Sequence, residues 1–178
     1  MSNPYVVVAK AEITSSTSTI DLTMDANYDN YYLSFSNIVG SDNQTRLNCK
    51  VKVGGTLQTA TYSNASLRMI LNGSNFSASG ENYNATASQL FRTDVCAFTT
   101  GKDSLNGEVF IHHSQDNDRY TLCNGHSEGM DGRAAQEMRM YLIGGGYHAD
   151  SVISDLHFYL DSGTFESGKI VLYGIANS

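Results

Sequence analysis

The chain has 178 residues, of which 40% are apolar, and this is enough for one domain to bury a substantial core. The formal net charge is -7 at pH 7 and no cluster of Lys and Arg stands out against it, which argues against binding to nucleic acid. No stretch approaches the roughly 18 consecutive apolar residues that span a bilayer, and residues 1–5 lack the features of a signal peptide. We therefore expect a single domain that is made in the cytoplasm and does not contact a membrane.

Short segments in which apolar and polar residues alternate recur along the chain, a pattern typical of strands with one buried face. Near the N-terminus, residues 5–13 and 19–24 are rich in β-branched side chains and predict the first two strands. Later strands are predicted where apolar residues share one face, at Leu33 and Phe35, at Leu47, Cys49, Val51 and Val53, at Val109 and Ile111, at Met138, Met140 and Leu142, at Leu156, Phe158 and Leu160, and at Ile170 and Leu172. No long helix is expected, because the best helical segment, residues 132–138, is too short to outweigh the strand pattern that follows it.

Turn-forming residues separate these segments. The pairs Asn106-Gly107 and Asn124-Gly125 supply the positive φ angles that tight hairpins need. Residues 144–146, three consecutive glycines, predict a wide turn, since the Lys-Ser/Thr continuation of a phosphate-binding loop is missing. About eight to ten short strands with frequent turns predict an all-β chain, a single antiparallel β-sandwich of jelly-roll type over residues 1–178.

Two segments are expected to lie outside the sandwich. The polar stretch 71–87 has only Phe76 and Tyr83 to anchor it, and it predicts a long exposed loop. Such loops are often functional, so this one is a candidate contact surface. Residues 1–8 are predicted to form a short N-terminal arm that adds an edge strand to a neighbouring molecule.

The cysteines and the paired histidines argue against a metal centre. Cys49, Cys96 and Cys123 are odd in number and widely spaced, so we expect free thiols and neither a disulfide framework nor a metal site. His112 and His113 are adjacent, so on a strand they point to opposite faces and do not chelate one ion together. No metal ion is therefore expected to be needed for folding.

Other residues that carry chemistry also lack a motif. Residues 116–118 imitate the start of a calcium loop, but the Gly and Glu that complete it are missing, so they predict a hairpin turn. No Gly-x-Ser-x-Gly elbow occurs. Three further histidines have no partner at ligand spacing: His126, His148 and His157. The paired carboxylates of a glycosidase leave no local motif in a sequence. The candidates here are Asp150, Asp155, Asp161 and Glu166. We interpret them as solvated charges in turns and at strand edges. We expect no catalytic, cofactor-binding or metal-binding residue.

Both ends of the chain resemble one family. The segment 161–175, DSGTFESGKIVLYGI, resembles the closing hairpin of a β-sandwich family found in structural proteins of tailed bacteriophages. The segment 28–38, YDNYYLSFSNI, is similar to the early strand of that family, and residues 45–56 also fit. In the closing segment we expect Gly163 and Gly168 to permit turns, and the strand after them to place its apolar residues in the core. The middle of the chain is unmatched.

The resemblance implies a virion structural protein that binds other proteins and is not an enzyme. Because no shaft segment precedes Tyr5, we expect a capsid decoration, or cement, protein on the outer surface of a phage capsid, with the major capsid protein or another virion protein as partner. A small tail or baseplate protein that binds a host-surface glycan or receptor is the alternative, and a sandwich-fold enzyme that degrades polysaccharides is a third possibility. Low charge density and 11 tyrosines predict self-association, and the resemblance favours a homotrimer.

Overall fold

The structure, a computed structural model, describes residues 4–72, 74–87, 89–93, 103–131 and 137–176. In these ranges the chain forms only strands: β1 (Tyr5–Ile13), β2 (Thr19–Thr23), β3 (Tyr31–Gly40), β4 (Leu47–Val53), β5 (Thr56–Leu57), β6 (Tyr62–Asn72), β7 (Asn75–Ala87), β8 (Phe91–Arg92), β9 (Leu105–His112), β10 (Thr121–Asp131), β11 (Glu137–Tyr147), β12 (Asp155–Leu160) and β13 (Phe165–Ile175). Over the same ranges no helix has the length and apolarity needed to cross a membrane. Of the short helical candidate, residues 132–136 lie outside the described residues and Met138 belongs to β11.

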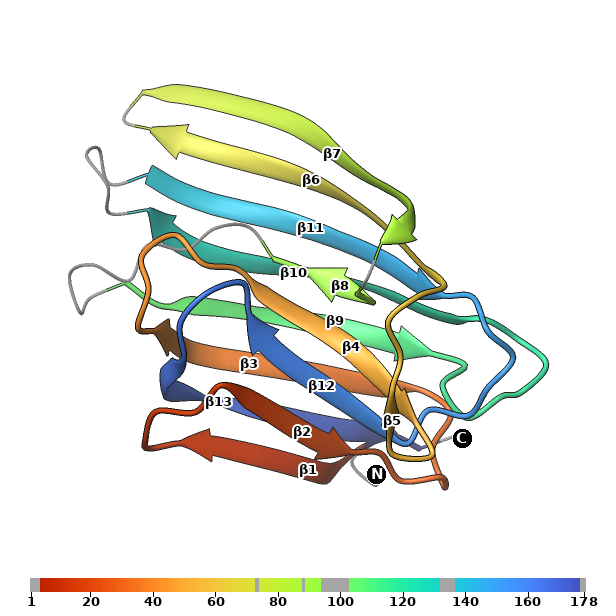
Figure 1. The fold of residues 1–178 in the computed structure, drawn as a ribbon. Helices are drawn as coiled ribbons and strands as arrows, with labels where there is room; N and C mark the ends of the chain where they lie inside the picture. Colours follow the sequence, from red (N-terminus) through yellow and green to blue (C-terminus); the bar gives the residue numbers. More distant parts are fainter. Residues whose placement is uncertain (1–3, 73, 88, 94–102, 132–136, 177–178) are drawn as a thin grey trace.

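The strands form two antiparallel sheets that pack face to face as a β-sandwich (Figure 1). The larger sheet has the order β1-β13-β3-β9-β10-β11-β6-β7, and the smaller has the order β2-β12-β4-β5, with β8 paired to β4. The pairing is nested, because β1 pairs with β13 and β2 pairs with β12, as in a jelly roll. The predicted all-β sandwich is confirmed.

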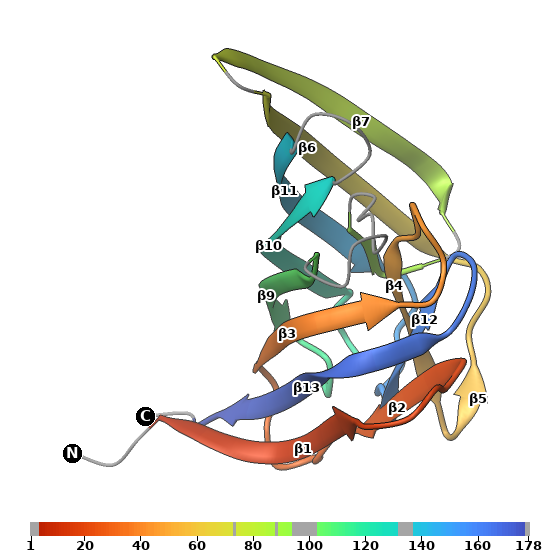
Figure 2. The ribbon, with the colours of Figure 1, turned by 90° about the vertical axis from the view of Figure 1, so that its left-hand side faces the viewer.

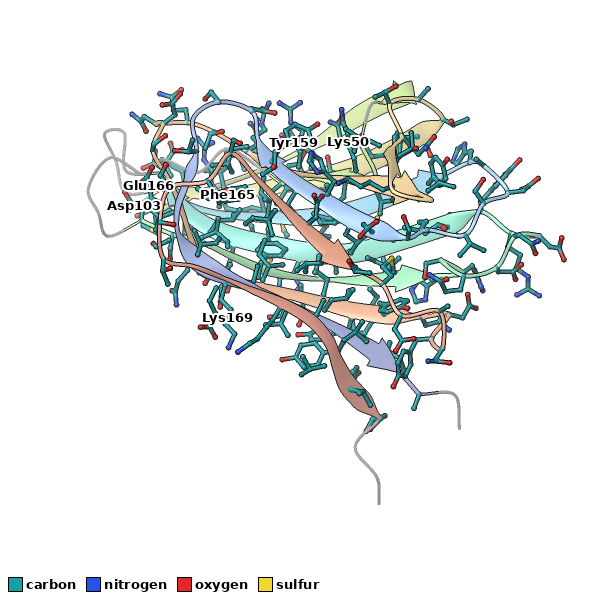
Figure 3. All side chains as sticks on the ribbon, turned by 60° about the horizontal axis from the view of Figure 1, so that its bottom comes forward. Lys50, Asp103, Tyr159, Phe165, Glu166 and Lys169 are labelled. Atoms are coloured by element: carbon teal, nitrogen blue, oxygen red, sulfur yellow. The ribbon has the colours of Figure 1, made fainter. Side chains whose placement is uncertain are left out.

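The core lies between the two sheets, where alternate residues of each strand point inward (Figure 3). In β3, Leu33 and Phe35 are buried, and opposite them on the smaller sheet Leu156 and Phe158 are fully buried. The outward-facing residues of the smaller sheet are polar or amphipathic. Lys50 and Tyr159 are an example: the Lys50 ammonium lies 5.1 Å from the centre of the Tyr159 ring.

The closing segment is integral to this core. β13 lies between β1 and β3, and both Ile170 and Leu172 are fully buried, as predicted. Gly163 has a φ of 74° in the turn before β13, which also agrees with the prediction. The prediction for Gly168 is wrong: it lies inside β13, at a register shift against β3, with a φ of 132°. There it forms a β-bulge, and a Cβ atom would lie only 2.8 Å from the Cα of Ile38.

Three predicted turns are also wrong, because their glycines lie inside strands. Gly107 belongs to β9, Gly125 to β10, and residues 144–146 to β11. Each allows another part of the protein to approach the backbone closely: a Cβ atom on Gly125 would lie 2.1 Å from the carbonyl oxygen of Glu108. A glycine that permits close packing has the same sequence signature as one that permits a turn.

The predicted loop at residues 71–87 is wrong as well. β6 and β7 form a long hairpin whose register runs from the pair Asn72 and Asn75 to the pair Tyr62 and Ala87. The segment is polar because the smaller sheet does not extend over it: the hairpin projects past β4 and β8 at the edge of the sandwich (Figure 2), and residues 75–80 are exposed on both faces. A strand that is solvated on both sides needs no apolar alternation.

The second half of the predicted N-terminal arm, residues 5–8 of 1–8, is part of the sheet, so the prediction of an arm is wrong there. Tyr5 pairs with Ile175 and Val7 pairs with Tyr173, so the chain from residue 5 onward is the edge strand β1. Residues 1–3 lie outside the described residues.

Candidate functional site

The most unusual surface of the molecule begins on β11, where the predicted faces are reversed. Arg139 and Tyr141 point inward and are buried, whereas Met138 and Leu142 point outward and are 43% and 42% exposed. The inward polar groups have partners: Arg139 donates a hydrogen bond of 2.9 Å to Glu137, and the Ser66 hydroxyl donates one of 2.6 Å to the Tyr141 Oη. The assignment of Met138, Met140 and Leu142 to the core was therefore wrong.

These outward residues continue across neighbouring strands as one apolar surface. The register of β6 against β11 places Leu67 beside Leu142, Met69 beside Met140 and Leu71 beside Met138. On the flanking strands, β7 adds Phe76 opposite Leu71, and β10 adds Met130 opposite Met138. We call this surface the Met/Leu face; it consists of Leu67, Met69, Leu71, Phe76, Met130, Met138, Met140 and Leu142. Four of the six methionines of the chain lie on it.

The Met/Leu face is suited to protein contact. It contains a shallow groove of about 220 Å³, lined mainly by Met69, Leu71, Phe76, Met138 and Met140. Phe76 is 67% exposed, which leaves roughly 100–170 Å² of aromatic surface in water, given the area that such rings bury in cores. Contiguous apolar surface on the outside of a sheet marks an interaction site, and methionine side chains adapt their shape to a partner.

A second cluster lies on the same outer face, over β13, β3 and β9. Tyr32 is at its centre, with ring centroids 5.6 Å from Tyr5, 5.2 Å from Phe110 and 5.7 Å from Tyr173. The Tyr32 hydroxyl donates a hydrogen bond of 2.6 Å to Glu108. Burial, together with this carboxylate, raises the pKa of Tyr32 to about 12, so the hydroxyl stays neutral. This cluster is a rigid aromatic surface, in contrast to the Met/Leu face.

The two edges of the larger sheet differ in their protection. β1 has a register shift between Val7 and Ala9, and the Lys10 ammonium lies 3.1 Å from a Glu12 carboxylate oxygen. Bulges and edge charges of this kind prevent strands of other molecules from pairing. β7 has 13 residues, no Lys, Arg or Pro, and a single charged residue, Glu81. The edge of the sheet beside the Met/Leu face is therefore the one open to pairing.

The cysteines that the structure describes are buried free thiols. Burial raises the pKa of Cys49 well above its usual range and that of Cys123 to about 12. A thiol with so high a pKa is a poor nucleophile and metal ligand. Cys96 lies outside the described residues.

The histidines make separate contacts. His112 lies 3.3 Å from the Asn30 Oδ1 and 3.0 Å from the Asn124 Oδ1. Nearby, the His113 Nδ1 lies 3.6 Å from an Asp29 carboxylate oxygen. Each of the other three lies close to a polar side chain: His126 to Glu108, His148 to Ser63 and His157 to Asp21. Within the described ranges, no three His, Cys, Asp or Glu side chains come together in a way that could hold a metal ion.

Two of the candidate carboxylates, Asp155 and Asp161, are not arranged as a glycosidase pair. Asp155 and Asp161 flank the two ends of β12, about 20 Å apart at 3.3 Å per residue, which is too far for either glycosidase geometry. Asp161 accepts hydrogen bonds from Asn48 and Arg92, and Glu166 accepts one of 2.9 Å from Thr164.

The calcium-loop candidate, residues 116–118, lies in the connection between β9 and β10, and the last carboxylate candidate, Asp150, lies near it. The Asp116 side chain accepts a hydrogen bond of 2.8 Å from the backbone N–H of Asp118, so residues 116–118 form the expected turn. Asp150 lines a depression beside this turn, together with Asp118.

Comparison with family models and with curated protein sequences finds no match to this chain.

Proposed function

We propose that the chain is a virion structural protein, a capsid decoration or cement protein that binds the outer surface of a phage capsid through the Met/Leu face. The exposure of this face is the observation that carries the proposal. Its partner is the major capsid protein or another virion protein, and the bound form is a homotrimer. The chain works by binding protein and not by catalysis.

The geometry of the β6–β7 hairpin supports this proposal. The hairpin extends the larger sheet beyond the smaller one, so the Met/Leu face and the open edge of β7 lie together at one end of the sandwich (Figures 1 and 2). A partner that covers the face would remove Phe76, Leu71 and Met138 from water, and one that pairs with β7 would add backbone hydrogen bonds. Apolar burial and strand addition are the two contributions that let an uncharged surface bind tightly.

The resemblance of residues 161–175 to the closing hairpin of phage structural proteins supports the placement in a virion. In the structure this segment supplies β13 and the turn before it, so the resemblance concerns the strand that holds β1 and β3 together. Such a strand carries stability and not chemistry, which is consistent with a protein whose task is assembly.

The test is binding to phage particles that lack the protein. Purified protein is added to such particles, and the bound fraction is measured by sedimentation for the parent and for Phe76→Ser and Met138→Gln. Each substitution is expected to weaken binding by roughly 30-fold or more, as for residues at the centre of an interface. Val152→Ser is the matched control, because Val152 is also 43% exposed but lies in the connection before β12, outside the Met/Leu face.

Equal binding of all four proteins would refute the role of the Met/Leu face, and no binding by the parent would refute the decoration function. Counting copies in purified particles by mass spectrometry separates the two positions in the virion. Many copies per particle support a decoration protein, whereas a few copies point to the tail or baseplate alternative.

A further inference from the structure

We propose that a depression at the β9–β10 end of the sandwich binds a neutral sugar, a single pyranose unit of a glycan, by stacking it on Tyr120. This inference is independent of the capsid-binding proposal, since it concerns a different end of the strands and a different chemistry.

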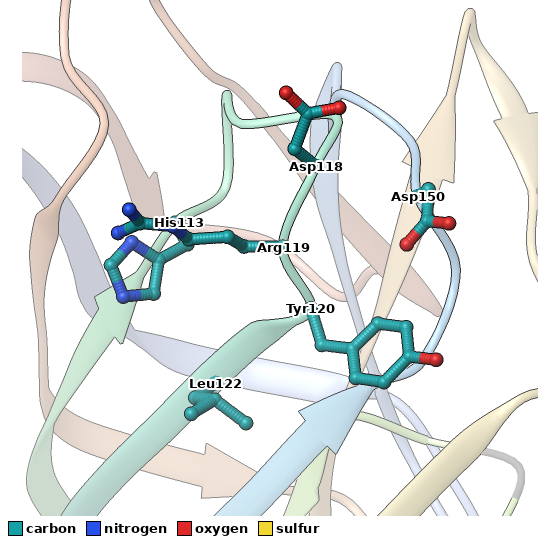
Figure 4. Close-up of a pocket in the computed structure, with 6 residues that line it drawn as sticks. All are labelled: His113, Asp118, Arg119, Tyr120, Leu122 and Asp150. Carbon is teal, nitrogen blue, oxygen red and sulfur yellow. The ribbon is translucent and has the colours of Figure 1, made fainter.

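The depression has a volume of about 580 Å³ and lies between two connections, residues 113–120 before β10 and residues 148–154 before β12. It is lined by His113, Asp118, Arg119, Tyr120, Leu122 and Asp150. Figure 4 shows Asp118 and Asp150 above the Tyr120 ring, with Arg119 and His113 on the opposite side and Leu122 below. The site thus combines the phenol ring of Tyr120 and the aliphatic side chain of Leu122 with hydrogen-bonding groups of both kinds.

Tyr120 is held in place although it is 52% exposed. Its ring stacks on His148, with the ring centroids 5.2 Å apart and an angle of 24° between the planes. The His148 Nε2 in turn lies 2.8 Å from the Ser63 hydroxyl, and its backbone N–H donates a hydrogen bond of 2.8 Å to the carbonyl oxygen of Thr61. Tyr120 itself lines the depression, so the exposed part of its ring is available to a ligand there. A fixed, exposed aromatic ring is a platform for the C–H face of a sugar, and its ordering precedes binding.

The groups around Tyr120 match sugar hydroxyls. The carboxylates of Asp118 and Asp150 accept hydrogen bonds, and the guanidinium of Arg119 donates them. The Arg119 Nε also lies 3.4 Å from an Asp116 carboxylate oxygen. Two exposed carboxylates against one cation make the site repel an acidic sugar, so we assign a neutral one.

The connection that carries Tyr120 rests on a rigid base. Ser114 is fully buried, its backbone N–H donates to the carbonyl oxygen of Asp29, and its own carbonyl oxygen accepts a hydrogen bond of 2.9 Å from Ile153. The Gln115 side chain donates a further bond of 2.8 Å to the carbonyl oxygen of Ile153. These contacts tie the two connections that form the depression to each other. Binding groups on loops with a fixed base keep their geometry.

The test is saturation-transfer NMR on the full chain with methyl glycosides of glucose, galactose and N-acetylglucosamine, and with N-acetylneuraminic acid as the acidic comparison. At least one neutral glycoside is expected to receive saturation, strongest at its ring C–H protons. Tyr120→Ala is expected to weaken binding roughly tenfold, the effect of one aromatic contact, and Tyr120→Phe to retain it. Tyr5→Ala is the matched control, because Tyr5 is an exposed tyrosine of the separate aromatic cluster, 40% exposed.

Circular dichroism establishes that the variants are folded. The proposal is overturned if no neutral glycoside receives saturation, if folded Tyr120→Ala binds as the parent does, or if N-acetylneuraminic acid binds as strongly as the neutral sugars. Because no virion component is present, the outcome is independent of whether the protein decorates a capsid.

Discussion

Replacing Gly145 by Ala should destabilise the sandwich by forcing its two sheets apart at one point. Gly145 lies in β11 of the larger sheet, and a Cβ atom there would lie 1.9 Å from the carbonyl oxygen of Leu90, which precedes β8 of the smaller sheet. An ordinary contact requires about 3.4 Å, so the Leu90 backbone would have to move by about 1.5 Å. Leu90 is fully buried and its N–H donates a hydrogen bond of 2.7 Å to the carbonyl oxygen of Cys49, so this movement also strains the attachment of β8.

Overpacking of this kind costs about 1–3 kcal/mol, and the clash with backbone places Gly145→Ala at the upper end. For a chain of this size, a loss of about 3 kcal/mol lowers the melting temperature by about 6–12 °C. The assay is thermal and urea unfolding followed by circular dichroism. Gly80→Ala in β7 is the control, because no atom lies within 4 Å of the added Cβ and its stability should equal or slightly exceed that of the parent. If both variants melt within a degree or two of the parent, the close packing of Leu90 on β11 is wrong.

Two further predictions concern the core. Leu172→Ala should cost about 2–5 kcal/mol because Leu172 is fully buried, whereas Leu142→Ala on the exposed side of the sheet should cost less than about 1 kcal/mol, and equal losses in urea unfolding would contradict the assignment of faces. Burial raises the pKa of Cys49 in the folded chain and raises that of Cys123 to about 12. As the pH rises, the thiols of the unfolded chain therefore lose their protons before those of the folded chain, near the ordinary pKa of about 8.5. The stability that the neutral thiols contribute is therefore complete below that pH and is lost as the pH rises toward 12, by up to about 1.4 kcal/mol per pH unit for each thiol. The free energy of unfolding between pH 7.5 and 10.5 should fall less steeply for Cys123→Ala than for the parent, and parallel slopes would show that this thiol is accessible in the folded state.

The class of fold was predictable because the alternation of apolar and polar residues requires only that a strand has one buried face and one solvent-exposed face. Leu33 with Phe35 and Ile170 with Leu172 follow that pattern and are buried as expected. The pattern fails for the β6–β7 hairpin, because residues 75–80 of β7 are exposed on both faces. A strand of 13 residues therefore resembled a polar loop in the sequence. It also fails at Gly125 and Gly145, where the requirement is a close approach of backbone from a distant part of the chain. Such tertiary requirements leave no local signal.

The Met/Leu face could not be predicted for a related reason. Alternation shows that Met138, Met140 and Leu142 share a face, but not that this face is outside. The decisive residues are their neighbours Arg139 and Tyr141, which alternate with them and are buried with polar partners in the fold. The depression at Tyr120 depends on His148, 28 residues away in the sequence, and on the packing of two connections, so no spacing rule indicates it.

The nested pairing of strands has a consequence for synthesis on the ribosome. β13 is the last of the described strands to be made, yet it lies inside the larger sheet between β1 and β3, which are among the first. Until it emerges, the backbone edges of β1 and β3 that pair with β13 have no partner, and the larger sheet of the nascent chain stays incomplete. In a translation product that stops before Phe165, β1 has no strand to pair with. We expect such a product to be cleaved by proteases or to aggregate. The topology thereby makes closure of the larger sheet conditional on the synthesis of β13.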